Sequence, residues 1–209
     1  MKIPKIIHQI WIGPNEPPKF MNTWKENHPD YEYILWGNEM VKGFLPIKNQ
    51  HLYDQYDNET RNIWNGRANL LRYEILYKYG GIYVDADAKS LRPLEGDFLE
   101  SDFFIVRVNE KKRGNRLNNC FIGSIPQHPL MEKCIDELNK FDLIQQPSFQ
   151  FSGPVFITEI VNKYGFDVTV LPSYYFSPYF FERGGVYKGD FKPFADHQWG
   201  TTRKLYGKI

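Results

Sequence analysis

Short apolar runs alternate along the chain with longer segments that repeat apolar residues at helical spacing. The short runs predict strands at residues 5–12, 31–36, 81–85, 103–108, 119–124 and 167–171. The longer segments predict helices at 20–27, 59–79, 128–141 and 154–164. Strands that alternate with helices are typical of an α/β fold, in which helices flank a mostly parallel central sheet. We expect one domain over residues 1–209, with an irregular C-terminal segment at 172–209 that is a candidate lid.

One predicted strand ends in two aspartates that are one residue apart. The helix pattern before it stops at Gly80 and Gly81, because glycine accepts the left-handed backbone that often ends a helix. Residues 82–84, Ile-Tyr-Val, are good strand formers. Residues two apart in a strand point to the same side, so Asp85 and Asp87 are expected to face one target together.

Two carboxylates at a strand end suit a hard divalent cation. Mg²⁺ and Mn²⁺ are commonly held by one or two carboxylates, by water and by the phosphate oxygens of a substrate. Arg72 precedes the pair on the predicted helix, and the glycine and glutamate of a calcium-binding loop are absent. Asp85 and Asp87 therefore predict a metal-diphosphate site, and the alternative interpretation of such a pair is a solvated turn.

The same segment carries a resemblance to a known family. Residues 67–87, RANLLRYEILYKYGGIYVDAD, resemble the core of the glycosyltransferases with a DXD sugar-binding region, especially glycosyltransferase family 32. The resemblance continues in family order through residues 3–13 (IPKIIHQIWIG), 24–36 (WKENHPDYEYILW), 118–129 (NNCFIGSIPQHP) and 152–154 (SGP). It implies a GT-A type fold with a single nucleotide-sugar-binding domain.

The resemblance also implies a catalytic set and a donor site. Asp85, Asp87 and Arg72 match the catalytic motif, and Arg72 is expected to bind the donor sugar or to brace an aspartate. Trp11 matches the family's Trp-Ile-Gly motif and is a candidate for stacking on the nucleotide base, with a core position as the alternative. Asn69 stands where the family typically has aspartate, which leaves the choice of sugar open. The full set of expected nucleotide- and donor-binding residues is Gln9, Ile10, Trp11, Asn69, Arg72, Asp85, Ala86, Asp87 and Arg203.

A third metal ligand is implied near the C-terminus. His197, in the segment ADHQW at 195–199, resembles the family's C-terminal histidine before a tryptophan, although the Gly-Ser-Trp that follows in the family is absent. We expect Asp85, Asp87 and His197 to hold Mn²⁺ or Mg²⁺. Asp196 is the alternative ligand, and an exposed histidine is the alternative role for His197.

The function implied by the resemblance is transfer of a hexose from a nucleotide-diphosphate sugar to a hydroxyl acceptor, with retention of configuration. A uridine diphosphate sugar is the favoured donor and a glycan or glycoprotein the expected acceptor, as in polysaccharide biosynthesis. Two alternatives stay open: a mannosyltransferase that uses guanosine diphosphate mannose, and a non-catalytic sugar-binding homologue. A phosphohydrolase would also use paired aspartates, but it usually needs further ligands close to them.

Composition fits a globular enzyme and excludes little else. The content of 42% hydrophobic and 24% charged residues is ordinary, and the net charge of +1 gives no broad basic field to recruit nucleic acid. Cys120 and Cys134 are too few for a disulfide framework and are expected to be buried thiols. His8 is expected to be a hydrogen-bonded core residue. No run approaches the about 20 apolar residues that cross a bilayer, and a cytoplasmic location is the simplest expectation.

Overall fold

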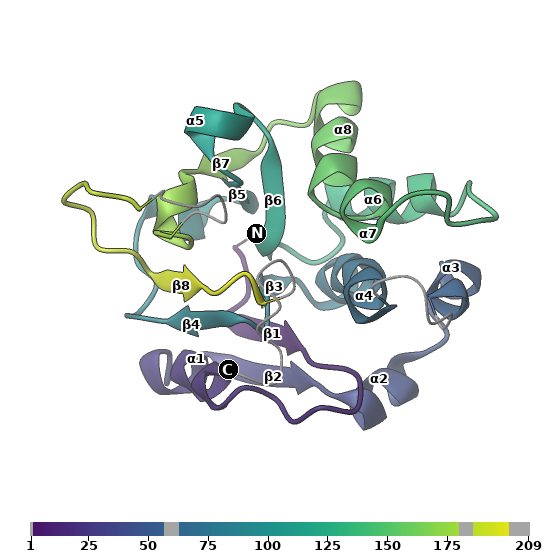
Figure 1. Cartoon of the computed structure of the whole chain (residues 1–209), viewed down its shortest axis with the longest axis horizontal. Coiled ribbons are helices and arrows are strands. Elements are labelled where there is room, and N and C mark those ends of the chain that lie inside the picture. Colours follow the sequence, from purple (N-terminus) through teal and green to yellow (C-terminus); the bar gives the residue numbers. More distant parts are fainter. Residues whose placement is uncertain (1, 57–62, 180–185, 201–209) are drawn as a thin grey trace.

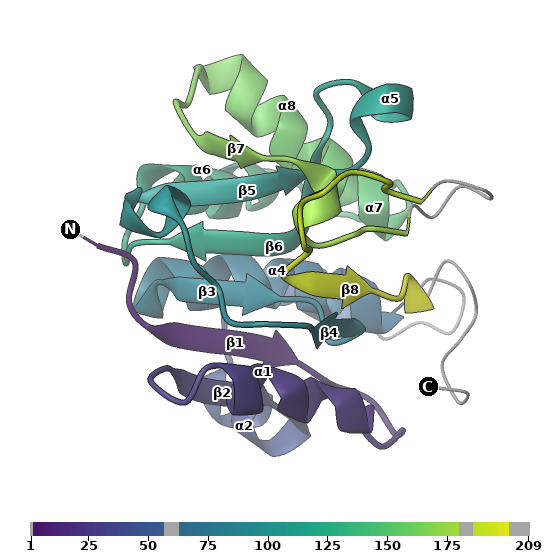
Figure 2. The same cartoon turned by 90° about the vertical axis from the view of Figure 1, so that its left-hand side faces the viewer.

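A six-stranded mixed sheet forms the centre of the computed structural model, which describes residues 2–56, 63–179 and 186–200. The strand order is β2-β1-β3-β6-β5-β7. Five strands run in one direction and β6 runs against them, pairing antiparallel with both β3 and β5 (Figures 1 and 2). The strands are β1 (Ile6–Ile10), β2 (Glu32–Trp36), β3 (Gly81–Val84), β5 (Phe103–Arg107), β6 (Leu117–Ser124) and β7 (Thr169–Leu171).

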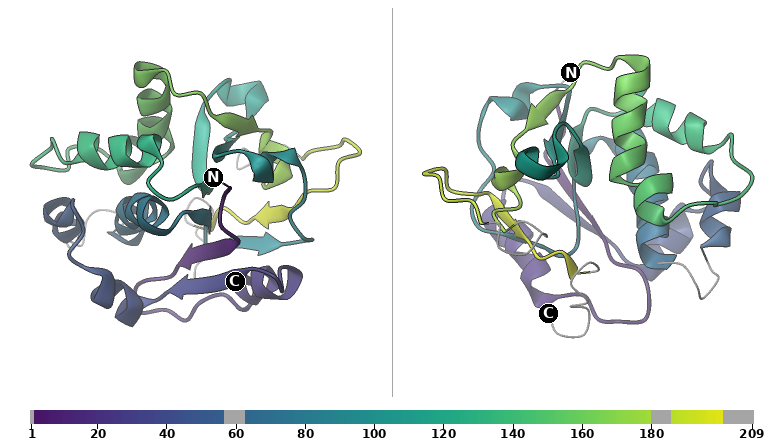
Figure 3. Two further views of the ribbon diagram at one scale, coloured as in Figure 1. Left: turned by 180° about the vertical axis from the view of Figure 1, so that it is seen from behind. Right: turned by 45° about the horizontal axis from the view of Figure 1, so that its top comes forward.

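Helices cover one face of this sheet. Helix α4 (Ile63–Tyr79) packs with α6 (Pro129–Leu138), α7 (Ser148–Phe151) and α8 (Pro154–Tyr164), and their apolar side chains join the sheet in one core cluster. This layer lies on the right in Figure 1 and on the left when the molecule is seen from behind in Figure 3. Short helices α2 (Asn38–Phe44) and α3 (Gln50–Gln55) extend it.

The other face is covered by a smaller layer with its own apolar cluster. Here β4 (Ala88–Ser90) and β8 (Ala195–His197) form a two-stranded antiparallel sheet in which Ala88 lies opposite His197. The 3-10 turn η1 (Lys19–Met21), helix α1 (Asn22–Asn27) and the 3-10 turns η2 (Asp97–Glu100) and η3 (Ser173–Tyr175) complete the layer. Trp24, Phe121 and Phe194 are among its buried aromatic residues. In this layer, β8 places His197 opposite Ala88, which lies shortly after the end of β3.

Most predicted elements appear with small changes at their ends. The strands predicted at 5–12 and 119–124 become Ile6–Ile10 and Leu117–Ser124, and the helix predicted at 154–164 becomes Pro154–Tyr164. The helix predicted at 20–27 divides into η1 and α1. Helices α2, α3, α7 and α5 (Glu110–Arg113), and strands β4 and β8, were not predicted. The irregular segment predicted at 172–209 is wrong where it contains η3 and β8, while residues 180–185 and 201–209 lie outside the described part of the chain.

Two further features bear on the expectations. His8 is fully buried, and Cys120 and Cys134 are buried free thiols, as the sequence predicts. In the described residues we find no helix with the length and apolar character that a membrane span requires.

Candidate active site

The helix-to-strand turn before the aspartates depends on glycine. Gly80 and Gly81 have φ angles of +64° and +92°, in the left-handed region that side chains other than glycine rarely adopt. A Cβ on Gly81 would lie 2.7 Å from the carbonyl oxygen of Ile6. The turn therefore brings β3 against β1 directly after α4 ends, and Asp85 follows at the carboxyl end of the sheet, where α/β folds bind ligands.

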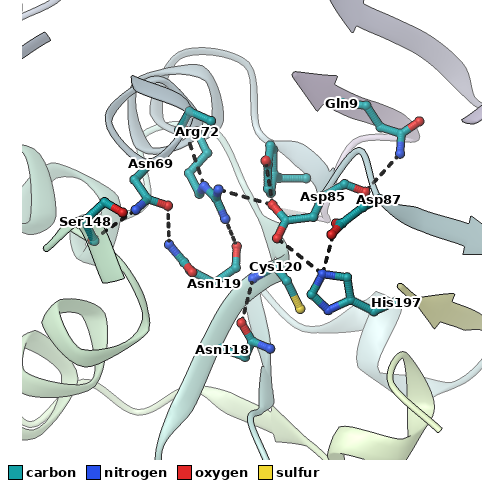
Figure 4. A network of polar contacts seen from close by, with 12 residues as sticks. Gln9, Asn69, Arg72, Asp85, Asp87, Asn118, Asn119, Cys120, Ser148 and His197 are labelled. Carbon is teal, nitrogen blue, oxygen red and sulfur yellow. Dashed lines mark hydrogen bonds and ion pairs between the residues drawn. The ribbon is translucent and has the colours of Figure 1, made fainter. Parts of the chain in front are cut away.

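Asp85 is held by two side chains from the helix and the strand. Nη2 of Arg72 lies 3.1 Å from Oδ1 of Asp85, and the Tyr83 hydroxyl donates to the same oxygen at 2.8 Å (Figure 4). Burial raises the pKa of Tyr83 well above its ordinary value, so the phenol stays a donor. The Arg72 guanidinium also lies 4.3 Å from the Tyr83 ring centroid and donates to the carbonyl of Asn119. Asp85 thus has a fixed orientation, with Oδ2 facing His197.

Asp87 forms a buried pair with His197. Nε2 of His197 lies 3.0 Å from Oδ1 of Asp87 and 3.8 Å from Oδ2 of Asp85. The backbone N–H of Gly200 donates to Oδ2 of Asp87 at 2.6 Å, and Gln198 N–H donates to the Asp87 carbonyl at 2.9 Å. Burial alone would lower the pKa of His197, but the Asp87 carboxylate raises it well above the ordinary value. Burial opposes ionisation of Asp87 as well, yet His197 holds its pKa below the ordinary value.

These three side chains fit a divalent cation. One ligand atom from each of Asp85, Asp87 and His197 lies within 4.8 Å of the others, a separation that a single metal ion can bridge. Two carboxylates and one imidazole are a donor set used for borderline and hard divalent ions. Asp196, the alternative ligand, accepts instead from Nε2 of Gln198 at 2.6 Å. Burial raises the pKa of the neighbouring Cys120 thiol, which therefore stays neutral.

A pocket of about 180 Å³ opens beside the aspartates. The side chains expected at the site that line it are Asn69, Arg72, Asp85, Ala86, Asp87 and His197. Residues without a predicted role also line it, including Asn65, Asn118, Asn119, Ser148, Phe149 and Trp199. Sequence reasoning missed Asn118 and Asn119 although both lie in a matched motif, because the direction of β6 was unknown. Since β6 runs antiparallel to β3, the start of β6 meets the end of β3.

The pocket's amide side chains are tied to one another. Nδ2 of Asn119 donates to Oδ1 of Asn69 at 3.0 Å, and Nδ2 of Asn69 donates to the carbonyl of Ser148 at 3.2 Å (Figure 4). Asn69 therefore links α4, the start of β6 and α7. The hydrogen bonds fix the amide that stands where the family typically has aspartate.

The remaining expected donor-binding residues do not line this pocket. Gln9 is fully buried, donates to the Asp85 carbonyl at 3.2 Å and accepts from the Tyr33 hydroxyl at 2.8 Å. Ile10 is buried in the core, and the half-buried Trp11 donates to the carbonyl of Asn15 at 2.7 Å. Donor binding by Gln9, Ile10 and Trp11 stays a prediction. Arg203 lies outside the described residues.

Comparison with known proteins agrees with this geometry. Residues 14–104 match the glycosyltransferase sugar-binding region containing a DXD motif. Inositol phosphoceramide mannosyltransferase 3 of Schizosaccharomyces pombe is 36% identical over 142 residues, which cover 66% of this chain and 38% of that protein. Mannosyl phosphorylinositol ceramide synthase SUR1 of Saccharomyces cerevisiae is 32% identical over 173 residues, which cover 78% of this chain and 42% of that protein. The chain thus spans less than half the length of either relative.

The solved structure of the PaToxG glycosyltransferase superposes with a TM-score of 0.60 at 18% identity, over 78% of this chain and 69% of that one. At this identity the match bears on the fold alone. It confirms the expected α/β fold of GT-A type, and the family match confirms the resemblance seen in the sequence.

Proposed function

Because residues 14–104 match the glycosyltransferase sugar-binding region containing a DXD motif, we propose that the protein is a glycosyltransferase that transfers mannose from guanosine diphosphate mannose to a hydroxyl acceptor. The observation that carries the proposal is the convergence of Asp85, Asp87 and His197 on one point in the pocket wall. Mannose is supported by the names of relatives that are 32–36% identical. The sequence favoured a uridine diphosphate sugar and ranked guanosine diphosphate mannose second; the relatives favour the second.

The metal site defines how the donor would be held. Asp85, Asp87 and His197 would bind Mn²⁺ or Mg²⁺, which when present offsets negative charge on the diphosphate. Arg72 and Tyr83 keep the Asp85 carboxylate aimed at the site before the donor arrives. Such preorganisation lowers the cost of ordering groups during the reaction.

Retention by front-face attack is the mechanism we favour. Among the described residues that line the pocket, the carboxylates are Asp85 and Asp87, and both belong to the metal site. Neither is available to form a covalent glycosyl intermediate. The leaving phosphate would then take the proton of the acceptor hydroxyl, as the family resemblance implies.

The acceptor we propose carries a phosphate, as does the inositol phosphoceramide in the relatives' names. Support comes from the hairpin at residues 107–116, RVNEKKRGNR, which has five basic residues and one acid, a charge of +4 in a chain of net +1. The acid, Glu110, accepts from the Ser173 N–H and hydroxyl, each at 2.6 Å. The hairpin leads directly into Asn118 and Asn119 in the pocket wall. A glycan or glycoprotein remains the alternative acceptor.

Calorimetric titration with guanosine and uridine diphosphates and their hexose conjugates, with and without Mn²⁺, tests the donor proposal. We expect Mn²⁺-dependent binding of guanosine diphosphate mannose that weakens at least about 100-fold in Asp87→Ala. Asp167→Ala is the matched control, because Asp167 is exposed and does not line the pocket. Tighter binding of a uridine diphosphate sugar would contradict the proposed donor and support the one that the sequence favoured. If no nucleotide bound, the transferase proposal would fail, and the alternative of a non-catalytic sugar-binding homologue would remain.

A further inference from the structure

Asn118 presents a buried hydrogen-bond donor that has no acceptor in the described part of the chain. The residue lies at the start of β6, is 5% exposed and lines the pocket. Its Oδ1 accepts from the backbone N–H of Cys120 at 3.2 Å (Figure 4). Its Nδ2 has no hydrogen-bond partner among the described residues. A buried amide without a partner carries its full desolvation penalty, so such a group calls for a ligand.

The orientation of this amide follows from its neighbour. The Cys120 N–H is a donor and therefore needs the oxygen end of the Asn118 amide. The reverse orientation would set two donors against each other. The nitrogen end is thus left for whatever occupies the pocket.

Four other residues of the pocket wall, Asn69, Asn119, Trp199 and Arg72, donate to protein acceptors. Nδ2 of Asn69 donates to Ser148 and Nδ2 of Asn119 to Asn69, while Nε1 of Trp199 donates to the carbonyl of Tyr179 at 2.9 Å. The Arg72 guanidinium is shared between Asp85 and two backbone carbonyls. Nδ2 of Asn118 has no protein acceptor among the described residues, and the other buried unpartnered side-chain atom of the lining, Nδ1 of His197, belongs to the proposed cation site.

We propose that Asn118 is a hexose-recognition residue, whose Nδ2 donates a hydrogen bond to a hydroxyl of the transferred sugar. The inference rests on the proposed function, because it takes a nucleotide hexose as the occupant of the pocket. A sugar hydroxyl suits this position because a neutral amide donor matches a neutral acceptor. The charged diphosphate is matched by the cation site of Asp85, Asp87 and His197.

Removal of the amide should affect the sugar and leave the nucleotide unaffected. In Asn118→Ala we expect kcat/KM for the preferred nucleotide hexose to fall about fivefold to tenfold, the worth of one neutral hydrogen bond. The affinity for the corresponding nucleoside diphosphate with Mn²⁺ should stay within about twofold of wild type, because that ligand has no hexose. An equal loss of affinity for the diphosphate would overturn the proposal.

A series of deoxy-hexose donors identifies the hydroxyl. The wild type should be less active on the one deoxy donor that lacks the contacted hydroxyl than on the parent donor. Asn118→Ala should be about equally active on these two donors, because the variant has already lost the hydrogen bond to that hydroxyl. Asn49→Ala is the matched control: Asn49 is a buried asparagine whose Oδ1 has no partner among the residues that the structure describes, and it lies outside the pocket lining. Asn49→Ala should lower the free energy of unfolding without changing the deoxy-donor ratios, meaning the activity on each deoxy donor divided by the activity on the parent donor.

The outcomes separate the two proposals. Unchanged deoxy-donor ratios in an active Asn118→Ala enzyme reject the role of Asn118 and leave the transferase function intact. If wild type binds no nucleotide hexose at all, the proposed function fails and the role of Asn118 fails with it.

Discussion

Side chains around the pocket hold one another in place before any ligand binds. Oδ1 of Asp85 receives both the Arg72 guanidinium and the Tyr83 hydroxyl, so its second oxygen is left to face His197. Behind this group, the His8 imidazole occupies a similar buried network. Its Nε2 lies 2.9 Å from the Gly80 carbonyl, and Nε1 of Trp36 donates to its Nδ1 at 3.1 Å. The neutral ring with a proton on Nε2 satisfies both partners.

Protonation of His8 should therefore destabilise the fold at acidic pH. Burial lowers the pKa of His8 from 6.5 to about 4, although the Gly80 carbonyl opposes the shift. Between these values the unfolded chain binds a proton that the folded chain does not, so the free energy of unfolding falls as pH falls. The loss amounts to about 3 kcal/mol over the window. Denaturant unfolding at a series of pH values measures it.

His8→Gln provides the comparison. Burial also lowers the pKa of His28 and of His128, so the variant keeps part of the pH dependence and only the difference between the two slopes belongs to His8. A variant that loses stability on acidification as steeply as the wild type would contradict the assignment.

Among the elements, the turn between α4 and β3 places the aspartates, and it was readable from sequence. Two glycines after a helix pattern predict a left-handed stop, and β3 follows as predicted. The expectation that strand alternation directs Asp85 and Asp87 to one side is wrong, because β3 ends at Val84 and the two aspartates lie in the turn before β4, where the Ala88 N–H donates to the Asp85 carbonyl at 3.0 Å. The strand period does not reveal which way a neighbour runs. Asn118 and Asn119 enter the pocket because β6 is antiparallel, and that direction is set by pairing with β3 and β5. The three-residue strand β8 likewise gains its ladder from β4, a contact between distant segments.

Gly81→Ala should be costly because two effects add. The φ of +92° strains any side chain, and the new Cβ would meet the Ile6 carbonyl oxygen at 2.7 Å and Nε2 of His8 at 3.0 Å. We expect the free energy of unfolding to fall by at least about 2 kcal/mol. Gly165→Ala separates the effects, since Gly165 has φ +66° after α8 with no atom within 4 Å of the added Cβ. It should cost about 1 kcal/mol. Equal losses in the two variants would show that the contact with β1 does not matter.

In the molecule as a whole, the distribution of charge matters more than its sum. The hairpin at residues 107–116 carries +4, so the rest of the chain carries −3. Figure 2 shows α5, within this hairpin, at the end of the sheet toward which β3 and β5 point, the end that also carries Asp85 and the pocket. Lys111 and Lys112 on α5 are exposed. An acceptor with a phosphate would approach the pocket through a locally positive field, which attracts anions and weakens with salt.

Reversal of this charge should change the choice of acceptor. For Lys111→Glu with Lys112→Glu, we expect the KM for an inositol-phosphate lipid acceptor to rise about tenfold at low salt and less at high salt, because exposed charges act through a screened field. Binding of the nucleotide donor should not change, since neither lysine lines the pocket. Transfer rates to the lipid and to a neutral mannoside, measured at two salt concentrations, check this.

Lys25→Glu with Lys42→Glu makes the same change of charge on α1 and α2, across the molecule from α5 in Figure 1. If this control pair raised the KM as much as the hairpin pair, the effect would come from net charge and the hairpin would have no special role. If Lys111→Glu with Lys112→Glu changed transfer to the lipid and to the neutral mannoside equally, the positive field would not recognise phosphate. Only a loss confined to the hairpin pair and to the phosphate-bearing acceptor supports recognition through residues 107–116.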